Sequence, residues 1–311
     1  MSPCGLLNLN KPAEMTSRQA VNLVERQTRP VRAGHAGTLD PLASGVLVVC
    51  VGAATRLIGY VQRMPKHYRG TFLLGRQSPT EDIEGEVTEL PNAPRPTREQ
   101  IVAAAVRLVG RIEQRPPAFS AIKVAGRRAY ELARQGRLPE LAARPVLIYA
   151  IEVTEYRYPE LLLDVACGSG AYIRSLGRDL AGLLGTSAVM SALVRTSIGS
   201  FTLEDAVDPR QLKRDDWLSF LQPPLRAVEY LPRLQLSADE IQFIRTGRTI
   251  PSRSPLAASR PLASPFSEAD NDRTADVEKI VALDPAGEFV GILTPGAAGQ
   301  FRTLRNMPTG T

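Results

Sequence analysis

The apolar and polar residues of this chain alternate in a way that predicts short strands joined by amphipathic helices. Six consecutive apolar residues, Val46–Val51, are rich in β-branched side chains and are bounded by Gly45 and Gly52, which predicts a strand buried on both faces. Residues 5–12, GLLNLNKP, alternate apolar and polar side chains and predict a strand that ends at a Lys-Pro turn. Residues 66–75, KHYRGTFLLG, predict a third strand.

Three helices are predicted from their start signals. In each, a Ser or Thr precedes a Gln or Glu by three residues, the spacing of a capping box, and apolar residues follow at helical spacing. These pairs are Thr16 with Gln19, Thr97 with Gln100, and Ser237 with Glu240. Because proline and glycine stop helices, the three should end near Pro30, Gly110 and Gly247.

The last third of the chain changes in character. Residues 206–232 suit a short helix and a linker, and residues 252–275 are so rich in Ser, Pro and Ala that we expect a disordered insertion there. Residues 279–293, KIVALDPAGEFVGIL, form two alternating runs around an Asp-Pro-Ala-Gly turn and predict a hairpin. A length of 311 residues is typical of about two domains.

Composition excludes several classes of protein. With 43% hydrophobic and 23% charged residues, the chain resembles an ordinary globular protein that can bury a full core. It has no apolar run of about 18 residues, so no membrane span is expected, and its first residues do not resemble a signal peptide. Three distant cysteines and two histidines offer neither a disulfide framework nor the spacing of metal ligands. We therefore expect a cytoplasmic, metal-free protein.

The charge balance favours a nucleic-acid partner without deciding the matter. The net charge is +6 and the pI is near 9.4. Arginine supplies most of the positive charge, and its planar guanidinium suits phosphate recognition.

The loop before the central strand combines polar side chains with glycine. Residues 33–45, AGHAGTLDPLASG, place His35 and Asp40 among glycines, and Pro41 directly follows the aspartate. Proline biases Asp40 away from helix, and the glycines permit close approach of the backbone to a ligand. A carboxylate on a stiff loop beside a buried strand suits catalysis, although an Asx-Pro turn is the alternative interpretation.

The segment GHAGTLDPLASGVL resembles the catalytic motif of the TruB family of tRNA pseudouridine synthases. This resemblance implies that Asp40 is the nucleophile and that His35 fills the gap left by a flipped base. GLLNLNKP is similar to the opening motif of the family, which implies that Lys11 and Pro12 support the catalytic loop.

Three further segments resemble motifs of the same family. The KHYR segment implies that Tyr68 stacks on the target base, whereas a tyrosine at such a position otherwise serves packing. CGSGAYIRSL implies that Tyr172 closes the pocket and that Arg174 pairs with Asp40; an arginine on a helix is otherwise a surface charge. LVRT implies that Leu193 underlies the base.

Two charged segments are open to more than one interpretation. Residues 114–135 carry Lys123 and Arg127 with aromatic residues between basic ones, which suits a nucleic-acid groove or a solvated charged helix. The resemblance implies that residues from 114 to about 145 form an insertion that grips the RNA backbone. Residues 78–87, SPTEDIEGEV, are acidic and are expected to form a solvated loop rather than a metal site.

One segment also resembles a different enzyme class. LLLDVACGSGA is similar to the S-adenosylmethionine-binding motif of methyltransferases, which places a glycine loop between a strand and a helix. That site requires an acidic residue about 20 residues further on, and none occurs between Leu180 and Leu203. An RNA methyltransferase is therefore the weaker alternative, together with a non-catalytic RNA-binding or chaperone protein.

The resemblance implies an α+β fold with a mixed, mainly antiparallel sheet, flanking helices and a small C-terminal PUA-like β-barrel. Residues 1–230 would form the catalytic domain and residues 231–311 the barrel. The implied reaction isomerises uridine 55 in the T-loop of tRNA to pseudouridine, without a cofactor or metal, in a monomeric enzyme.

Overall fold

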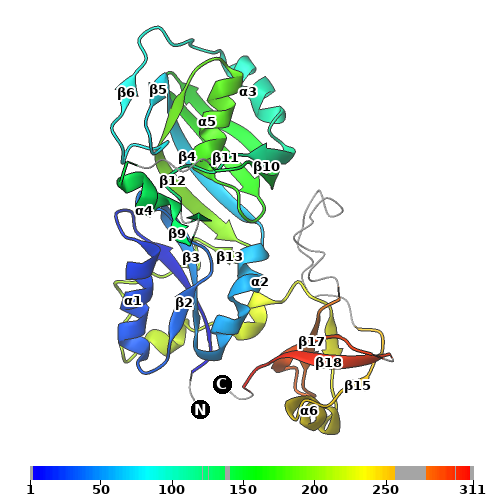
Figure 1. Cartoon of the computed structure of the whole chain (residues 1–311). Helices are drawn as coiled ribbons and strands as arrows, with labels where there is room; N and C mark the ends of the chain where they lie inside the picture. Colours follow the sequence, from blue (N-terminus) through cyan, green and yellow to red (C-terminus); the bar gives the residue numbers. More distant parts are fainter. Residues whose placement is uncertain are drawn as a thin grey trace. The chain divides into compact units, whose positions relative to one another are not determined.

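The computed structural model describes residues 3–120, 122–124, 126–136, 141–255, 278–297 and 299–308. The chain folds into two compact units (Figure 1). The first unit combines Met1–Met64 with Ser197–Thr311, and the second consists of Pro65–Thr196. The chain therefore leaves the first unit once and returns to it.

Strand β3 is the centre of the first unit, as predicted. It spans Ser44–Val51 and pairs antiparallel with β1 (Gly5–Lys11) and with the short β2 (Ala33–His35). Its alternate side chains enter two separate hydrophobic clusters, one with Val46, Val48 and Cys50 and the other with Leu47, Val49 and Val51. The prediction of a strand buried on both faces is confirmed.

Helix α1 (Ser17–Thr28) packs beside these strands and begins at the predicted capping box (Figure 1). The Thr16 side chain accepts a hydrogen bond from the Gln19 backbone N–H, and the Gln19 side chain accepts one from the Thr16 N–H. After β3 the chain turns at Gly52 into η1 (Gly52–Leu57) and α2 (Ile58–Arg63). Gly52 has φ +63°, and a Cβ there would lie 2.3 Å from the Pro3 carbonyl oxygen, so glycine is required.

The segment expected to be a short helix and linker is instead packed against the first unit's sheet. After β13 (Phe201–Thr202), Val207 bridges to Leu9 and Gln222 bridges to Leu6. Two 3₁₀ turns, η2 (Trp217–Phe220) and η3 (Pro224–Ala227), replace the expected helix. The buried Trp217 ring joins the cluster beneath α1, which anchors the segment.

The C-terminal residues of the first unit form a second, five-stranded sheet. The order is β14 (Arg233–Gln235), β16 (Ile280–Leu283), β17 (Phe289–Pro295), β18 (Gln300–Asn306) and β15 (Ile250–Pro251). The predicted hairpin is confirmed as β16 and β17, and the predicted capped helix as α6 (Ala238–Arg245). This sheet is consistent with a PUA-like domain. Most of the predicted insertion, residues 256–275, lies outside the described residues.

The second unit contains a sheet in the order β12 (Ala188–Ile198), β4 (Lys66–Leu74), β11 (Glu160–Cys167), β10 (Arg144–Arg157) and β7 (Gly110–Gln114). Helices α3 (Arg98–Val106) and α5 (Ile173–Leu183) pack against this sheet and against each other. Helix α3 ends four residues before the predicted stop at Gly110, because β7 begins there.

Short elements connect the larger ones in this unit. Strands β5 (Arg76–Gln77) and β6 (Thr88–Glu89) form one ladder, and β8 (Lys123–Val124) and β9 (Arg127–Arg128) form another, followed by α4 (Ala129–Arg134).

The position of β11 overturns the methyltransferase alternative. This strand precedes the glycine loop that resembled a cofactor site, and it pairs antiparallel with both β4 and β10. A doubly wound cofactor-binding fold requires parallel neighbours at that position. Within the described part of the chain, no helix combines the length and apolarity needed to cross a membrane.

Candidate active site

The loop that carries Asp40 is fixed at the residue before it. Ser17, in the first turn of α1, accepts a hydrogen bond from the Leu39 N–H at 2.8 Å and donates one to the Leu39 carbonyl at 3.1 Å. The Asp40 carbonyl accepts a bond from the Ala43 N–H at 3.1 Å, which closes a turn over Pro41. Asp40 is half-buried. Asp40 can therefore form the turn and still supply a reactive carboxylate, because the turn is closed by its backbone carbonyl.

A buried ammonium fixes the same loop at the residue after Asp40. Lys11 is fully buried, and its Nζ donates to the carbonyls of Pro12 at 2.8 Å, Met15 at 2.6 Å and Pro41 at 3.4 Å. The Pro41 carbonyl also accepts from the Glu14 N–H at 2.8 Å. The supporting role of Lys11 and Pro12 stays a prediction. His35 lies nearby in the chain, at the end of β2 opposite Val49.

In the second unit, Tyr68 and Leu193 lie on the neighbouring strands β4 and β12. Tyr68 is half-buried and Leu193 is 7% exposed. Two residues after Leu193, on the same face of β12, lies Arg195, which is 2% exposed. Its guanidinium carbon is 6.0 Å from the centre of the Tyr68 ring, and its Nη1 is 3.5 Å from the Tyr68 hydroxyl. This arginine is not among the residues predicted from the sequence, although the alternation of LVRT places it on the same face as Leu193.

Two buried cations, Lys66 and Arg195, lie close to the thiol of Cys167. Burial raises the pKa of Cys167 to about 12, although both positive charges act to lower it. The residue is therefore a neutral thiol at physiological pH and is unsuited to nucleophilic attack.

Tyr172 is held by a side chain from the edge strand β7. It caps the N-terminus of α5, and its N–H donates to Gln114 Oε1 at 2.8 Å while its carbonyl accepts from Gln114 Nε2 at 3.1 Å. Gln114 is 1% exposed, so its amide is shielded from water while Tyr172 is half-buried. The Arg144 guanidinium lies over the Tyr172 ring at 5.2 Å. No sequence motif points to this role of Gln114, because its partner lies 58 residues away.

Arg174 is buried in a polar cage. Its Nη1 donates to the Thr80 carbonyl at 2.8 Å and lies 3.3 Å from Asp82 Oδ2, and its Nη2 donates to the Phe119 carbonyl at 3.1 Å. Asp82 Oδ1 accepts from the Thr80 hydroxyl at 2.6 Å and from the Glu84 N–H at 3.1 Å. Because Asp82 is 1% exposed, the prediction of a solvated acidic loop is wrong at this residue.

The acidic loop is fixed between β12 and α5. The Ile83 N–H donates to the Met190 carbonyl at 3.1 Å, and the Met190 N–H donates to the Glu81 carbonyl at 3.0 Å. The Glu81 carboxylate accepts from the Ser175 hydroxyl at 2.8 Å and pairs with Arg178. Glu81 has φ +63°, a left-handed conformation that these contacts stabilise.

The predicted site residues thus belong to both units. Asp40, His35, Lys11 and Pro12 lie in the first unit, and Tyr68, Tyr172, Arg174 and Leu193 lie in the second. The pairing of Arg174 with Asp40 stays a prediction. Lys123 and Arg127 lie on β8 and β9, with their side chains outside what the structure describes. Among the described residues, no group of three or more His, Cys, Asp or Glu side chains is arranged to hold a metal ion.

Comparison with known proteins identifies the family. The sequence model described as "TruB family pseudouridylate synthase (N terminal domain)" matches residues 25–173. A tRNA pseudouridine synthase B from Rhodopirellula baltica is 36% identical over 335 residues, which cover 99% of this chain and 96% of the relative. The chain belongs to the TruB family. It is therefore a pseudouridine synthase, as its motifs imply, and not a methyltransferase or a non-catalytic RNA-binding protein.

A second relative agrees with this assignment, and solved structures share the fold. A tRNA pseudouridine synthase B from Mycobacterium tuberculosis is 42% identical over 80% of this chain and 84% of its own. A chain in the crystal structure of a Cbf5–Nop10–Gar1 complex superposes with a TM-score of 0.71 at 24% identity, covering 98% of this TruB-family chain and 84% of that chain. A chain of an archaeal Nop10–Cbf5 complex gives a TM-score of 0.68 at 22% identity, with 97% and 85% covered. The predicted α+β fold is confirmed.

Proposed function

We propose that this enzyme isomerises uridine 55 in the T-loop of tRNA to pseudouridine, with Asp40 as the nucleophile. The relatives named tRNA pseudouridine synthase B support a tRNA substrate. The role of Asp40 is supported mainly by the way its loop is held: Ser17 hydrogen-bonds the backbone of Leu39, and Lys11 donates to the Pro41 carbonyl. Because the loop is hydrogen-bonded on both sides of the carboxylate, its backbone should stay in place when the uracil base enters the site.

The chemistry balances without a second reactant. The bond between N1 of uracil and C1′ of ribose breaks, the base rotates, and a bond forms between C5 and C1′. The proton lost from C5 goes to solvent, and N1 takes up a proton, so the nucleoside keeps its mass. A carboxylate can act as the nucleophile in such a reaction without a metal, and we assign that role to Asp40.

The other predicted residues receive roles in binding the flipped uridine. A uridine in a folded loop must leave its stack, which costs a few kcal/mol, and stacking on one aromatic ring returns about 1–3 kcal/mol. We assign Tyr68 to stacking, Leu193 to the floor beneath the base, His35 to the gap in the loop, Tyr172 to pocket closure, Arg174 to orienting Asp40, and Lys123 and Arg127 to the RNA backbone. Cytoplasmic localisation and a monomeric state belong to the same proposal.

The test uses an unmodified tRNA transcript and no added cofactor. After incubation, the RNA is digested to nucleosides, and the modified position is mapped by carbodiimide labelling and primer extension. The wild-type enzyme should form pseudouridine at position 55 with no gain in mass. Asp40→Asn should bind the tRNA with similar affinity and form none, while Asp164→Asn, which alters a half-buried aspartate of β11 away from the predicted site residues, should remain active. An active Asp40→Asn enzyme would refute the assignment of the nucleophile.

A further inference from the structure

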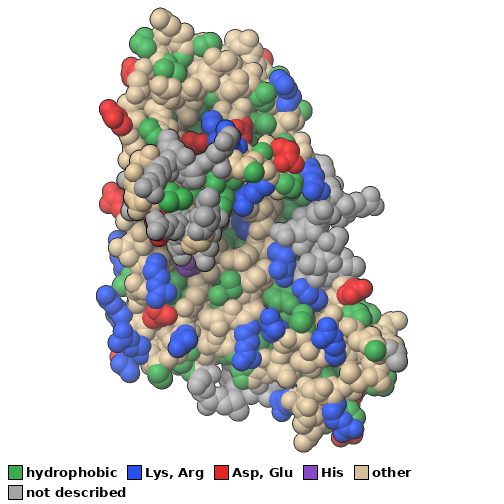
Figure 2. Space-filling view, viewed as in Figure 1, with side chains coloured by type: hydrophobic (Ala, Val, Ile, Leu, Met, Phe, Trp, Pro, Cys, Tyr) green, Lys and Arg blue, Asp and Glu red, His purple; other side chains and the backbone are tan. Residues whose placement is uncertain are grey.

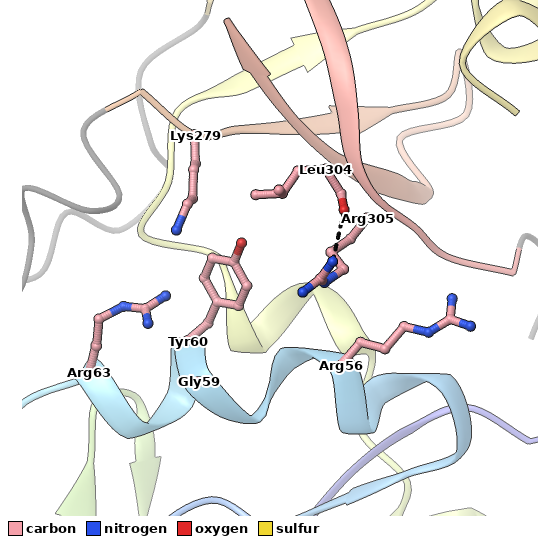
Figure 3. Close-up of a pocket in the computed structure, with 7 residues that line it drawn as sticks. All are labelled: Arg56, Gly59, Tyr60, Arg63, Lys279, Leu304 and Arg305. Carbon is pink, nitrogen blue, oxygen red and sulfur yellow. Dashed lines mark hydrogen bonds between the residues drawn. The ribbon is translucent and has the colours of Figure 1, made fainter. Parts of the chain in front are cut away.

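Charged and aromatic side chains gather at several places away from the Asp40 loop. Lys and Arg side chains are spread over the face of the molecule that Figure 2 shows, so charge does not mark one part of that face as a further site. The pocket in Figure 3 is formed by η1, α2 and residues of the C-terminal part of the first unit, and no predicted site residue is among the described residues that line it. The contacts around Tyr172 in the second unit differ, because they hold a residue that the family motifs assign to the site.

Tyr172 is held by two residues that face each other across one strand ladder. Gln114 on β7 and Arg144 on β10 are direct partners in the antiparallel pairing of these strands. Side chains of directly opposed residues lie on the same face of a sheet, so both can reach the start of α5. Gln114 binds the Tyr172 backbone, and Arg144 covers the Tyr172 ring. The register of the ladder therefore places a backbone contact and a ring contact side by side.

The contact with the backbone fixes the start of a helix. Tyr172 is the N-cap residue of α5, and its own side chain makes no capping hydrogen bond. Its carbonyl accepts the first bond of the helix from the Leu176 N–H at 3.0 Å and a second bond from Gln114 Nε2 at 3.1 Å. Its N–H donates to Gln114 Oε1 at 2.8 Å. Gln114 thus fixes the point where the loop becomes a helix, and the Tyr172 ring takes no part in the cap.

The contact with the ring is not needed to begin the helix. The Arg144 guanidinium carbon is 5.2 Å from the centre of the Tyr172 ring, within the range of a cation–π contact. The buried Arg144 Nε has no hydrogen-bond partner among the residues that the structure describes. A cation over one face limits the directions that the ring can take, and Tyr172 is half-buried, so part of it stays accessible. Capping explains the Gln114 bonds but not the placement of Arg144, which acts on the ring.

We propose that Gln114 and Arg144 are positioning residues for the isomerisation, Gln114 through the backbone of Tyr172 and Arg144 through its ring. Neither would touch the reacting atoms; together they set the position of the aromatic ring against the bound uridine. The place of Tyr172 in the uridine pocket rests on the proposed function, whereas the two contacts are features of this structure. Because a small displacement of a group beside the reacting atoms slows the chemical step, both residues should act on the rate more than on tRNA affinity.

The test measures the single-turnover rate and the tRNA affinity of full-length variants. Gln114→Met removes both backbone bonds and should lower the rate about 10²-fold, with little change in affinity. Arg144→Met removes the cation and keeps the cap, so it should lower the rate about tenfold and stays informative if Gln114→Met does not fold. Arg144→Lys keeps a cation and should recover most of that loss. The matched control is Arg95→Met: the Arg95 guanidinium carbon lies 4.8 Å from the centre of the Tyr158 ring in the same unit, and its loss should change neither quantity.

Removing the ring shows whether Arg144 acts through it. In a Tyr172→Leu background, Arg144→Met should have no further effect on the rate, because no ring is left to position. An equal loss with and without the ring would overturn the proposal, and so would unchanged rates in the Gln114 and Arg144 single variants. A loss of tRNA affinity at an unchanged rate would also overturn it, by assigning Arg144 to RNA contact instead.

A spectroscopic measurement tests the ring contact without requiring activity. Protein labelled with 3-fluorotyrosine should give a fluorine NMR resonance for Tyr172, which Tyr172→Phe identifies by its loss. Arg144→Met should shift this resonance and Arg95→Met should not, and this comparison decides the matter if Tyr172→Leu forms no product. An unmoved resonance in Arg144→Met would overturn the proposal, since the cation would then not hold the ring. If the wild type forms no pseudouridine while the resonance shifts, the proposed function fails and the ring contact stands.

Discussion

Replacing Asp82 by Asn removes the negative charge from a buried ion pair while keeping the size of the side chain. Arg174 is 5% exposed, so its charge stays in the interior after the substitution. The carbonyls of Thr80 and Phe119 continue to accept its hydrogen bonds. The new amide must also accept from the Thr80 hydroxyl and the Glu84 N–H, as the carboxylate does. We therefore expect a stable but clearly weakened fold.

The magnitude follows from the cost of leaving a buried charge without its partner. Breaking a buried ion pair by removing one member costs about 3–5 kcal/mol. Because the carbonyls of Thr80 and Phe119 still accept from Arg174, we expect Asp82→Asn to lie at the lower end of this range, a loss of about 3 kcal/mol in the free energy of unfolding. In a protein of this size, 1 kcal/mol lowers Tm by about 2–4 °C, which gives a decrease of roughly 6–12 °C.

The assay is urea unfolding of the variant beside Asp164→Asn. Asp164 also pairs with an arginine, Arg69, at 2.9 Å and 3.0 Å, but the side chains are 35% and 57% exposed. Exposed pairs contribute about 0–1 kcal/mol, so the two variants should differ by at least ~2 kcal/mol. The double variant Asp82→Asn/Arg174→Met should lose less stability than the sum of the single losses, since no buried charge is then unpaired. If Asp82→Asn and Asp164→Asn unfold at the same urea concentration, the argument from burial is wrong.

Two further predictions concern other buried groups. Ser17→Ala removes both hydrogen bonds to Leu39, so we expect it to lower the free energy of unfolding by about 1–3 kcal/mol and to lower kcat more than tRNA affinity. Ser219→Ala, on the surface, is the control and should change neither quantity. An unchanged kcat in Ser17→Ala would show that the Asp40 loop does not need these two bonds. Burial raises the pKa of Cys50 and Cys167 to about 12, so the native thiols should resist iodoacetamide from pH 7 to about 9 and react only after unfolding. Since the unfolded thiols ionise first as pH rises, stability should fall above pH ~9 by about 1 kcal/mol per pH unit for each thiol; a flat stability from pH 9 to about 10.5 would contradict this.

The elements that could be predicted from the sequence have local causes. The strand at Val46–Val51 follows from its own residues and flanking glycines, and the start of α1 follows from one pair of side chains three residues apart. The hairpin of β16 and β17 likewise depends on a turn between adjacent runs. Within each of these elements, the interacting residues are neighbours in the sequence, so a pattern of a few residues contains the information.

The buried polar residues of the candidate site could not be predicted in this way. Asp82 meets Arg174, and Gln114 meets Tyr172, across separations of 92 and 58 residues. An acidic loop is ordinarily solvated, and only the distant partner makes burial of the carboxylate favourable. Arg195 was missed for the same reason, since its neighbour Tyr68 comes from another strand. Family motifs identified Tyr172 and Arg174 but not the residues that hold them.

Asp40 and Asp82 differ in which part of the residue is held by its neighbours, the backbone or the carboxylate. At Asp40, the contacts from Ser17 and Lys11 engage the backbone of Leu39 and Pro41, so these bonds keep their donors and acceptors whatever the charge of the Asp40 side chain. At Asp82, the carboxylate itself makes the contacts. Asp40→Asn should therefore abolish turnover at a small cost in stability, and Asp82→Asn should cost far more stability. In the proposed role of Asp40, these backbone bonds would hold the loop while the carboxylate changes its own bonds during the reaction.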